Sequence, residues 1–383
     1  MPDVHALLSA SAAKRWLNCP PSVRLTENMP ESQSEFAAEG TLAHELAELK
    51  LRKKFEVMPK SKYTKALEVI KADPLYNAEM DGYTDEYLDF VLSLAHKYDK
   101  TKPYIVIEKQ LNYSHIAKDG FGTSDCVLLC KNDLHIIDLK YGKGVPVSAE
   151  NNPQLKLYAL GAIAEYSLLY GIENVFLHIV QPRTEEGSSS WEISANELIA
   201  WGESIKPIAE LAYNGEGEFK CGEWCKFCKA KATCKARAEN FFSLESTAAM
   251  PKELLSDSEI GDALIRAQTL KNWVTDLEEY ALNAILTGTD IAGWKAVEGR
   301  SNRKISDVDS AFEILKSNGY DEALLYERKP IGITDLEKLV TKKKLDELIG
   351  DKIVKPQGKP TLAPADDKRK PYKPDVKEIF GGN

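Results

Sequence analysis

Two kinds of apolar periodicity alternate along the middle of the chain and predict its fold class. Runs rich in β-branched and aromatic residues, which favour strands, occupy YIVIEKQLNY (104–113), GFGTSDCVLLC (120–130), HIIDLKYGKG (135–144) and VFLHIVQPR (175–183). Apolar residues at helical spacing fill NNPQLKLYALGAIAEYSLLYG (151–171) and SANELIAWGESIKPIAELAY (194–213). The order β-β-β-α-β-α predicts an α/β core, a mixed β-sheet flanked by helices.

Helical patterns also precede this core. We expect a short helix that ends before Pro20 and Pro21, and a longer one over GTLAHELAELKLRKKF (40–55) with Thr41 as its N-cap. The pattern over 61–100 predicts amphipathic helices inserted before the first strand, which either cover the core or form a flap.

The C-terminal third differs from the core in composition. Amphipathic segments dominate residues 241–355 and predict a helical C-terminal extension. From Pro356 the chain is rich in Pro and Lys and poor in apolar residues, so the tail 356–383 is expected to be loosely ordered alone. We therefore predict three parts: a domain over 1–240, a mainly helical region over 241–355, and the tail.

Composition sets broad limits on function. The 383 residues are 43% hydrophobic and 28% charged, which is typical of a globular protein with a sizeable core. No apolar run approaches the ~20 residues that span a bilayer, and the N-terminus lacks the pattern of a signal peptide, so we expect a cytoplasmic protein without a membrane partner. The net charge of −9 weakens any model of broad adhesion to nucleic acid. A local basic groove stays open, and one candidate patch is Arg300, Arg303 and Lys304.

Two carboxylates and a lysine are predicted to converge on adjacent strands. Asp125 lies on the second strand, and Asp138 and Lys140 lie two residues apart on the third, where alternation places both side chains on one face. Mg²⁺ prefers carboxylate oxygens, and a nearby lysine can orient or deprotonate a water or neutralise developing charge. The pattern favours metal-dependent hydrolysis of a phosphodiester. For D-x-K alone, an ion pair on a solvated strand face is the simpler interpretation.

Seven cysteines divide into groups by their surroundings. Cys126 and Cys130 lie in an apolar strand and are expected to be buried thiols. Four others cluster in CGEWCKFCKAKATCKAR, namely Cys221, Cys225, Cys228 and Cys234. The C-x₂-C-x₅-C spacing of the last three is compact ligand spacing for Zn²⁺ or an iron–sulfur cluster, which a reducing compartment favours over disulfides. The fourth ligand can come from Cys221, giving a local zinc site, or from Cys19.

Taken in order, these residues resemble the core of the PD-(D/E)XK nuclease superfamily, in particular its RecB-type branch. The resemblance covers residues 10–240 and has four parts: a histidine on an upstream helix, an acid after a glycine on a strand, a D-x-K followed by a glycine, and a Q-x-x-x-Y helix. The matching residues are His44, Asp125, Asp138, Lys140, Gly142, Gln154 and Tyr158. The resemblance implies a restriction-endonuclease-like mixed β-sheet.

The resemblance also implies a role for most of these residues. The implied ligands of Mg²⁺ or Mn²⁺ are His44, Asp125, Asp138 and the backbone carbonyl of Leu139. Lys140 would be the catalytic lysine. Gln154 and Tyr158 would place Lys140 or the DNA backbone, although ordinary helix surface and core explains them about equally well. Glu108 on the first strand is a weaker candidate for a supporting role.

RecB-type nucleases with an iron–sulfur cluster, including AddB-like and CRISPR-adaptation nucleases, have one cysteine before the core and three after it in a C-x₂-C-x₅-C pattern. The chain resembles them, since Cys19 in WLNCPPS precedes a proline. The resemblance implies a [4Fe–4S] cluster that clasps the two ends of the domain, bound by Cys19, Cys225, Cys228 and Cys234. Cys221 departs from this pattern and keeps a Zn²⁺ site open, bound by Cys221, Cys225, Cys228 and Cys234.

The favoured function is a metal-dependent DNA nuclease, and we expect an exonuclease in recombination, replication or end processing. The chain, including its tail GKPTLAPADDKRKP, also resembles a phage and prophage family of RecB-type nucleases. That resemblance implies DNA ends or single strands as partners, a single-strand annealing protein beside them, and the cytoplasm of a bacterial host. A homo-oligomer around DNA would confer processivity, but nothing in the sequence demonstrates one.

Two alternatives stay open. One is a catalytically silent DNA-binding or scaffold protein on a nuclease fold, against which the intact Asp125, Asp138 and Lys140 argue. The other is a zinc-containing interaction protein. The chain has no G-x-x-x-x-G-K-[ST] phosphate loop, so any unwinding of DNA would need a partner.

Overall fold

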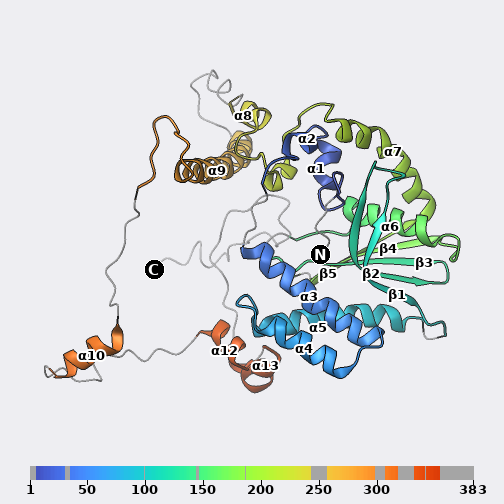
Figure 1. The fold of residues 1–383 in the computed structure, drawn as a ribbon, viewed down its shortest axis with the longest axis horizontal. Coiled ribbons are helices and arrows are strands. Elements are labelled where there is room, and N and C mark those ends of the chain that lie inside the picture. Colours follow the sequence, from blue (N-terminus) through green and yellow to red (C-terminus); the bar gives the residue numbers. More distant parts are fainter. Residues whose placement is uncertain are drawn as a thin grey trace, which may run out of the picture. The chain divides into compact units, whose positions relative to one another are not determined.

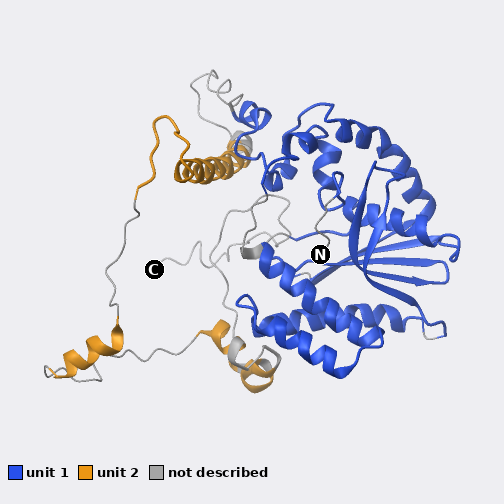
Figure 2. Cartoon of the chain, in the orientation of Figure 1, with its two compact units in different colours: residues 1–250 blue, residues 251–383 orange. Residues whose placement is uncertain are grey.

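A computed structural model describes most of the chain. It covers residues 6–30, 35–98, 100–143, 146–185, 187–242, 257–297, 307–317, 332–340 and 342–353. The chain forms two compact units, Met1–Met250 and Pro251–Asn383 (Figure 2). The predicted site residues all belong to the first unit.

A five-stranded sheet organises the first unit (Figure 1). Its strands are β1 (Tyr104–Asn112), β2 (Phe121–Cys130), β3 (Asp133–Leu139), β4 (Asn174–Gln181) and β5 (Gly187–Ser194). They lie in sequence order, with β3 and β4 parallel and all other neighbours antiparallel. A parallel pair needs a long connection, and a helix supplies it here. The predicted mixed α/β fold is confirmed.

Helices surround this sheet. They are α1 (Ala13–Asn18), α2 (Ser22–Thr26), α3 (Glu35–Phe55), α4 (Lys60–Lys71), α5 (Ala78–His96), α6 (Pro153–Tyr166), α7 (Ala195–Asn214), the 3₁₀-helix η1 (Glu223–Phe227) and α8 (Lys235–Phe242). Alternation along β3 points Leu134 and Ile136 to one face, and Ile137 and Leu139 to the other. The first face packs against α1, α2, α6 and α7, and the second against α3 and α5 (Figure 1). Burial on both faces explains the nearly continuous apolar run of β3.

Local signals fix the ends of the two long helices on the first face. The side chain of Asn152 accepts hydrogen bonds from two backbone N–H groups of α6, and Pro153 occupies its first turn as predicted. Ser194 and Glu197 form a capping box at the start of α7, which ends at Gly215 with φ +77°.

The upstream helices correct one expectation and settle another. Helix α3 begins at Glu35, so Thr41 is not its N-cap; its hydroxyl donates to the Ala37 carbonyl at 3.1 Å inside the helix. The alanine-rich sequence before Gly40 favours helix and extends it N-terminally. Within the inserted helices, α5 covers the core, since Tyr87 and Val91 pack against the sheet.

Strand β5 was not expected from the sequence. Its residues, GSSSWEIS, are mostly small and polar, and exposure alternates along them. Among the described residues the strand lies at the edge of the sheet and pairs with β4 alone. An edge strand contributes little apolar surface, so its pattern is weak.

A chain of hydrogen bonds crosses the α5 side of the sheet. Ser190 Oγ lies 2.8 Å from His178 Nδ1, and His178 Nε2 lies 3.0 Å from His135 Nδ1. His135 Nε2 lies 2.7 Å from the hydroxyl of Tyr98, which donates to Asp133 at 2.8 Å. Burial lowers the pKa of His135 to about 4 and that of His178 to about 3, so both rings are neutral at pH 7. Tyr98 has a single proton and donates it to Asp133. Each hydrogen bond in this series, from Ser190 onward, is therefore donated in the direction of Asp133.

These rings make stability sensitive to acid. An unfolded histidine binds a proton below about pH 6.5, whereas the folded rings stay neutral until pH 4 or lower, so stability should fall as the pH drops from 6.5 to 4. The limit is about 1.4 kcal/mol per pH unit for each ring. Urea unfolding at several pH values should show a shallower dependence for His178→Gln than for the wild type. The matched control, His96→Gln on exposed α5 surface, should keep the wild-type slope, and equal slopes for all three proteins would contradict this expectation.

The second unit is helical where it is described. Its helices are α9 (Asp257–Leu286), α10 (Val308–Ser317), α12 (Ile333–Val340), α13 (Lys342–Ile349) and the 3₁₀-helix η3 (Gly350–Lys352), in accord with the predicted extension. The predicted basic patch Arg300, Arg303 and Lys304 and the tail 356–383 lie outside the described residues. Across the described part of the chain, none of the helices combines the length and apolar character needed to cross a bilayer.

Candidate functional site

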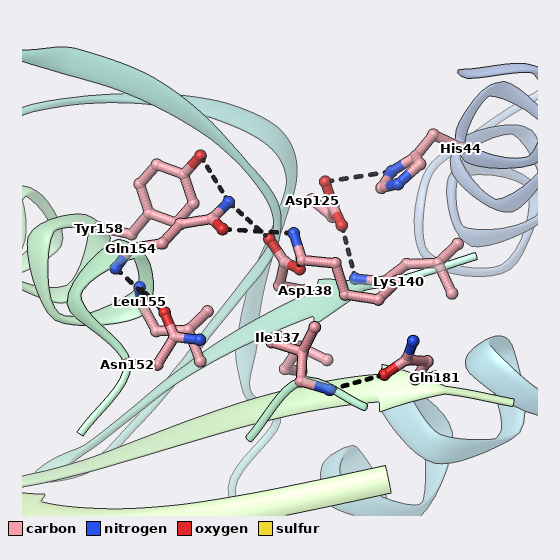
Figure 3. A network of polar contacts seen from close by, with 12 residues as sticks. His44, Asp125, Ile137, Asp138, Lys140, Asn152, Gln154, Leu155, Tyr158 and Gln181 are labelled. Atoms are coloured by element: carbon pink, nitrogen blue, oxygen red, sulfur yellow. Dashed lines mark hydrogen bonds and ion pairs between the residues drawn. The ribbon is translucent and has the colours of Figure 1, made fainter. Parts of the chain in front are cut away.

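The candidate site lies where β2 and β3 separate (Figure 3). The two strands pair as far as Cys126 and Ile137, and their regular pairing stops there. One position further, Asp125 turns its carboxylate into the gap, where Oδ2 accepts a hydrogen bond from the backbone N–H of Leu139 at 2.7 Å. The Asp125 carboxylate therefore takes the place of a backbone carbonyl as the acceptor for Leu139, and β2 and β3 are separated at this point.

The backbone of Leu139 faces the same gap. Its N–H meets Asp125, whereas the N–H of Lys140 donates to the Val180 carbonyl on β4 at 2.8 Å. The N–H and C=O of one strand residue point to the same neighbouring strand. The Leu139 carbonyl therefore points toward Asp125, the direction that its predicted ligand role requires.

A hydrogen-bonded network lies beside Asp125 (Figure 3). Lys140 Nζ lies 2.7 Å from Asp138 Oδ2 and donates to Gln154 Oε1 at 3.3 Å. Gln154 Nε2 donates to Asp138 Oδ1 at 3.1 Å and to the Tyr158 hydroxyl at 3.3 Å. The amide of Gln154 thus holds both members of the acid–lysine pair. The Q-x-x-x-Y spacing places Gln154 and Tyr158 on the face of α6 that meets this pair.

Gly122 gives the ring of Tyr158 room against β2. A Cβ atom at Gly122 would lie 2.8 Å from Cε1 of that ring, which is closer than side chains pack. A larger residue would push Tyr158 away from Gln154. This contact gives a physical reason for the glycine three residues before Asp125.

His44 on α3 approaches Asp125 from the opposite face of the sheet. Its Nδ1 lies 3.4 Å from Asp125 Oδ1. Burial by itself lowers the pKa of His44, but Asp125 outweighs it and raises the value to about 9, so the ring is protonated at neutral pH. Burial opposes ionisation of Asp125 as well, yet His44 and the Leu139 N–H hold its pKa below the usual value.

The second acid and the lysine depend on each other. Burial raises the pKa of Asp138 and Asp125 raises it further, while Lys140 opposes both. Burial lowers the pKa of Lys140, but Asp138 outweighs it, so the net shift is upward and the ammonium is charged. Two crowded carboxylates thus need positive charge beside them, which a protonated His44 and Lys140 supply.

The donors fit a hard divalent cation. Asp138 is 3% exposed, and its Oδ2 accepts no hydrogen bond of ordinary geometry among the described residues, although Lys140 lies close. That oxygen, Asp125 and the Leu139 carbonyl are ligands of the kind that Mg²⁺ and Mn²⁺ prefer. His44 would have to lose its proton to ligate a metal, so a bound cation would replace the proton's charge.

Glu108 lies closer to the site than its sequence position indicated. One ligand atom each of His44, Glu108 and Asp125 lie within 4.8 Å of one another. The sequence marked Glu108 only as an acid on the preceding strand. The sequence carries no signal for this position, because it depends on the backbone of Glu108, which departs from strand conformation with φ +52°.

Five cysteines meet at a second place in the same unit. Cys19, which follows α1, lines a small cavity together with four cysteines around η1, namely Cys221, Cys225, Cys228 and Cys234. All seven cysteines are free thiols, and Cys126 and Cys130 are buried in β2 as predicted. Burial, with a smaller contribution from neighbouring Cys221, raises the pKa of Cys225 to about 11. A metal bound here would have to displace protons from such thiols.

The spacing of these thiols bears on which metal they fit. Thiolates around Zn²⁺, at about 2.3 Å from the metal, are about 3.8 Å apart. Among the described residues, which include all five cysteines, no three Sγ atoms lie within 4.8 Å of one another. Cys221 and Cys225 interact with each other, since Cys221 raises the pKa of Cys225, but no third sulfur atom joins them within that limit.

The fold and the site define a mixed α/β protein with an acid–lysine pair at an opening in its sheet. The chain belongs to the family DUF2800, described as "Protein of unknown function (DUF2800)", whose model matches residues 5–370. Similar solved structures include a "putative exonuclease" from Eubacterium rectale, with 13% identity over 65% of this chain and 90% of that one, at a TM-score of 0.34. An alkaline exonuclease from Laribacter hongkongensis has 14% identity over 47% of this chain and 93% of its own, at a TM-score of 0.24. A likeness at this level does not decide the activity of the chain.

Proposed function

We propose that the protein is a metal-dependent DNA nuclease whose site is the opening between β2 and β3. The observation that carries the proposal is the joint placement of Asp125, Asp138 and Lys140, with Gln154 bonded to the acid and the lysine. The resemblance of the ordered motifs to RecB-type nucleases supports the same reaction class. It also supports DNA ends as the substrate.

Each side chain has a task in that reaction. Asp125, Asp138, the Leu139 carbonyl and His44 would hold Mg²⁺ or Mn²⁺, which when bound polarises a phosphoryl oxygen. The ammonium of Lys140 is held in place by Asp138 and Gln154, where it can orient the attacking water and neutralise charge that develops on the phosphate. Gln154 keeps Lys140 and Asp138 in register, and Tyr158 fixes Gln154 in turn.

We further propose that Cys19, Cys225, Cys228 and Cys234 bind a [4Fe–4S] cluster. All four line one cavity, and their order, with Cys19 before the core and a C-x₂-C-x₅-C pattern after it, resembles that of RecB-type nucleases with an iron–sulfur cluster. Cys221 lines the same cavity and is the alternative fourth ligand. The cluster would tie the segment around α1 and α2 to the segment around η1.

The nuclease proposal predicts DNA cleavage that depends on metal. The wild-type protein should degrade linear DNA in Mg²⁺ or Mn²⁺ and stop when a chelator is added, and an exonuclease should leave closed circular plasmid intact. Asp138→Asn should lower the rate at least about 10²-fold, because it removes a charged ligand and the partner of Lys140.

The matched control is Asp119→Asn, an exposed acid outside the site whose side chain contacts Tyr213. It should keep the wild-type rate. Failure of the wild-type protein to cleave linear duplex or single-stranded DNA with either metal would overturn the proposal, as would full activity in Asp138→Asn.

A further inference from the structure

The segment that carries the later cysteines differs in charge from the rest of the chain. Residues 225–237 contain five basic side chains and no acid, whereas the whole chain has a net charge of −9. A positive cluster on a negative chain indicates a local surface for a negatively charged partner. The five basic residues are Lys226, Lys229, Lys231, Lys235 and Arg237.

Part of this charge faces the thiols. Lys231 and Arg237 line the cysteine cavity, where positive charge stabilises thiolates. Lys226, Lys229 and Lys235 are not among the residues that line this cavity, and all three are exposed. Compensation of thiolate charge therefore accounts for Lys231 and Arg237 and leaves the three exposed lysines to be explained.

A phenylalanine is exposed among these lysines. The side chain of Phe227 is 78% exposed, and Lys226 Nζ lies 5.6 Å from the centroid of its ring. An apolar ring in water forgoes the free energy that burial would provide. Its exposure inside a basic segment favours contact with a partner that offers both negative charge and a flat apolar surface.

The cysteines bring these four residues together. Cys225, Cys228 and Cys234 line one cavity, and neighbouring Cα atoms in the chain are about 3.8 Å apart. Each of the four is next to one of these cysteines in the sequence, so all of them lie around that cavity. We call this set the basic rim: Lys226, Phe227, Lys229 and Lys235.

Contacts with the N-terminal helices hold the rim in place. Lys14 of α1 pairs with Glu223 of η1 at 2.9 Å, although both side chains are exposed. Lys229 donates to the backbone carbonyl of Met29, which follows α2, at 3.3 Å. A surface that is already held in one conformation loses less entropy when a ligand binds.

We propose that the basic rim binds single-stranded DNA. Its lysines contact successive phosphates, and the ring of Phe227 stacks on a base. Bases of a single strand can offer a face to an aromatic ring, whereas those of a duplex are stacked on one another. The choice of DNA as the nucleic acid rests on the proposed nuclease function, for which the rim would hold a strand outside the reaction site.

The first test is the affinity for a fluorescently labelled thymidine strand of about 15 nucleotides, measured on the full chain with its cysteine-bound metal. Mg²⁺ and Mn²⁺ are left out, so that no cleavage occurs. Phe227→Ala should weaken binding of the strand at least about fivefold, and binding of a duplex of equal length less, because it removes a stacked base. Phe227→Trp should retain the wild-type affinity. The matched control is Leu169→Ala, which removes another apolar side chain that is 78% exposed and should change neither affinity.

The second test is the dependence of strand binding on salt. Each phosphate contact contributes about 0.7 to the slope of log affinity against log salt concentration for single strands. Lys226→Gln should therefore weaken binding and make the slope shallower by about that amount. The matched control is Lys65→Gln on α4, which removes an exposed lysine outside the rim and should keep the wild-type slope.

Metal content and thermal unfolding separate lost binding from lost folding. Lys226 and Phe227 are exposed, so their variants should keep the wild-type metal content and unfolding temperature. Should Phe227→Ala lose metal, the salt slope of Lys226→Gln decides the proposal.

The outcomes distinguish the rim from the nuclease site. Unchanged strand affinity in a folded Phe227→Ala, an equal loss for strand and duplex, or an unchanged slope in Lys226→Gln would overturn the proposal, even if the protein cleaves DNA. A loss specific to the strand, restored by Phe227→Trp, would support it even if DNA is not cleaved. In that case the nuclease proposal fails and the binding surface stands.

Discussion

Replacing Lys140 by methionine is expected to reduce cleavage of linear DNA by about 10²–10⁴-fold while leaving the protein folded. The side chain keeps its length and loses its ammonium, which lies 2.7 Å from Asp138 and donates to Gln154. The attacking water and the phosphate would then lack the positive charge of the Lys140 ammonium, which Asp138 and Gln154 hold in place. Single-turnover rates on end-labelled duplex measure this loss.

The same change should also shift the pH dependence. Lys140 is the main group that opposes the rise in the pKa of Asp138 caused by burial and by Asp125. Without it, Asp138 takes up a proton at higher pH, so the residual activity of Lys140→Met should need a more alkaline solution than wild-type activity does. An unchanged profile would mean that Asp138 does not depend on Lys140.

The control for Lys140 is Lys143→Met, which removes an exposed lysine three residues further along the chain. Its rate should stay within about twofold of the wild type, since surface charges outside a site contribute little. Equal losses in the two variants would indicate general attraction of DNA and would contradict a specific role for Lys140. Thermal unfolding of both variants checks that they fold.

Replacing Cys19 by serine is expected to remove most of the metal bound at the cysteine cavity and to destabilise the first unit. Cys19 and the three later cysteines line one cavity, although they come from opposite ends of this unit. A ligand change that weakens binding a thousandfold costs about 4 kcal/mol of stability at saturating metal. Iron and zinc analysis, absorbance near ~400 nm and urea unfolding of protein purified without oxygen measure these effects.

Two further cysteine variants make that experiment decisive. Cys221→Ser should retain the bound metal if Cys19 is the fourth ligand. Cys130→Ala, which removes a buried thiol of β2 far along the sheet, should retain it in every case. Loss of metal in Cys221→Ser with retention in Cys19→Ser would replace the iron–sulfur assignment by a local zinc site.

Much of the fold could be predicted because its signals are local. The apolar runs of β1 to β4 gave strands, and Pro153 marked the first turn of α6. The predicted candidates Asp125, Asp138 and Lys140 could be placed together because alternation along adjacent strands fixes which side chains share a face. The contact between Gln154 and this pair follows from the same logic, since the helix after β3 has to return across that face.

The features that escaped prediction depend on contacts distant in sequence. Strand β5 is recognisable only as the partner of β4, because its own residues are mostly serine. The left-handed backbone of Glu108 occurs within an ordinary strand sequence, so no local pattern announces it. The meeting of Cys19 with the other four cysteines needs the whole first unit to be folded, and the sequence left the fourth ligand open for that reason.

The cysteine cavity also has a consequence for synthesis of the protein. Cys19 leaves the ribosome about 200 residues before Cys225, and the entire sheet is made in between. At translation rates of about 5–20 residues per second, the first thiol waits about 10–40 s for its companions. The proposed cluster would therefore have to be inserted into a nearly complete first unit, and until then Cys19 would have to stay reduced and unreacted.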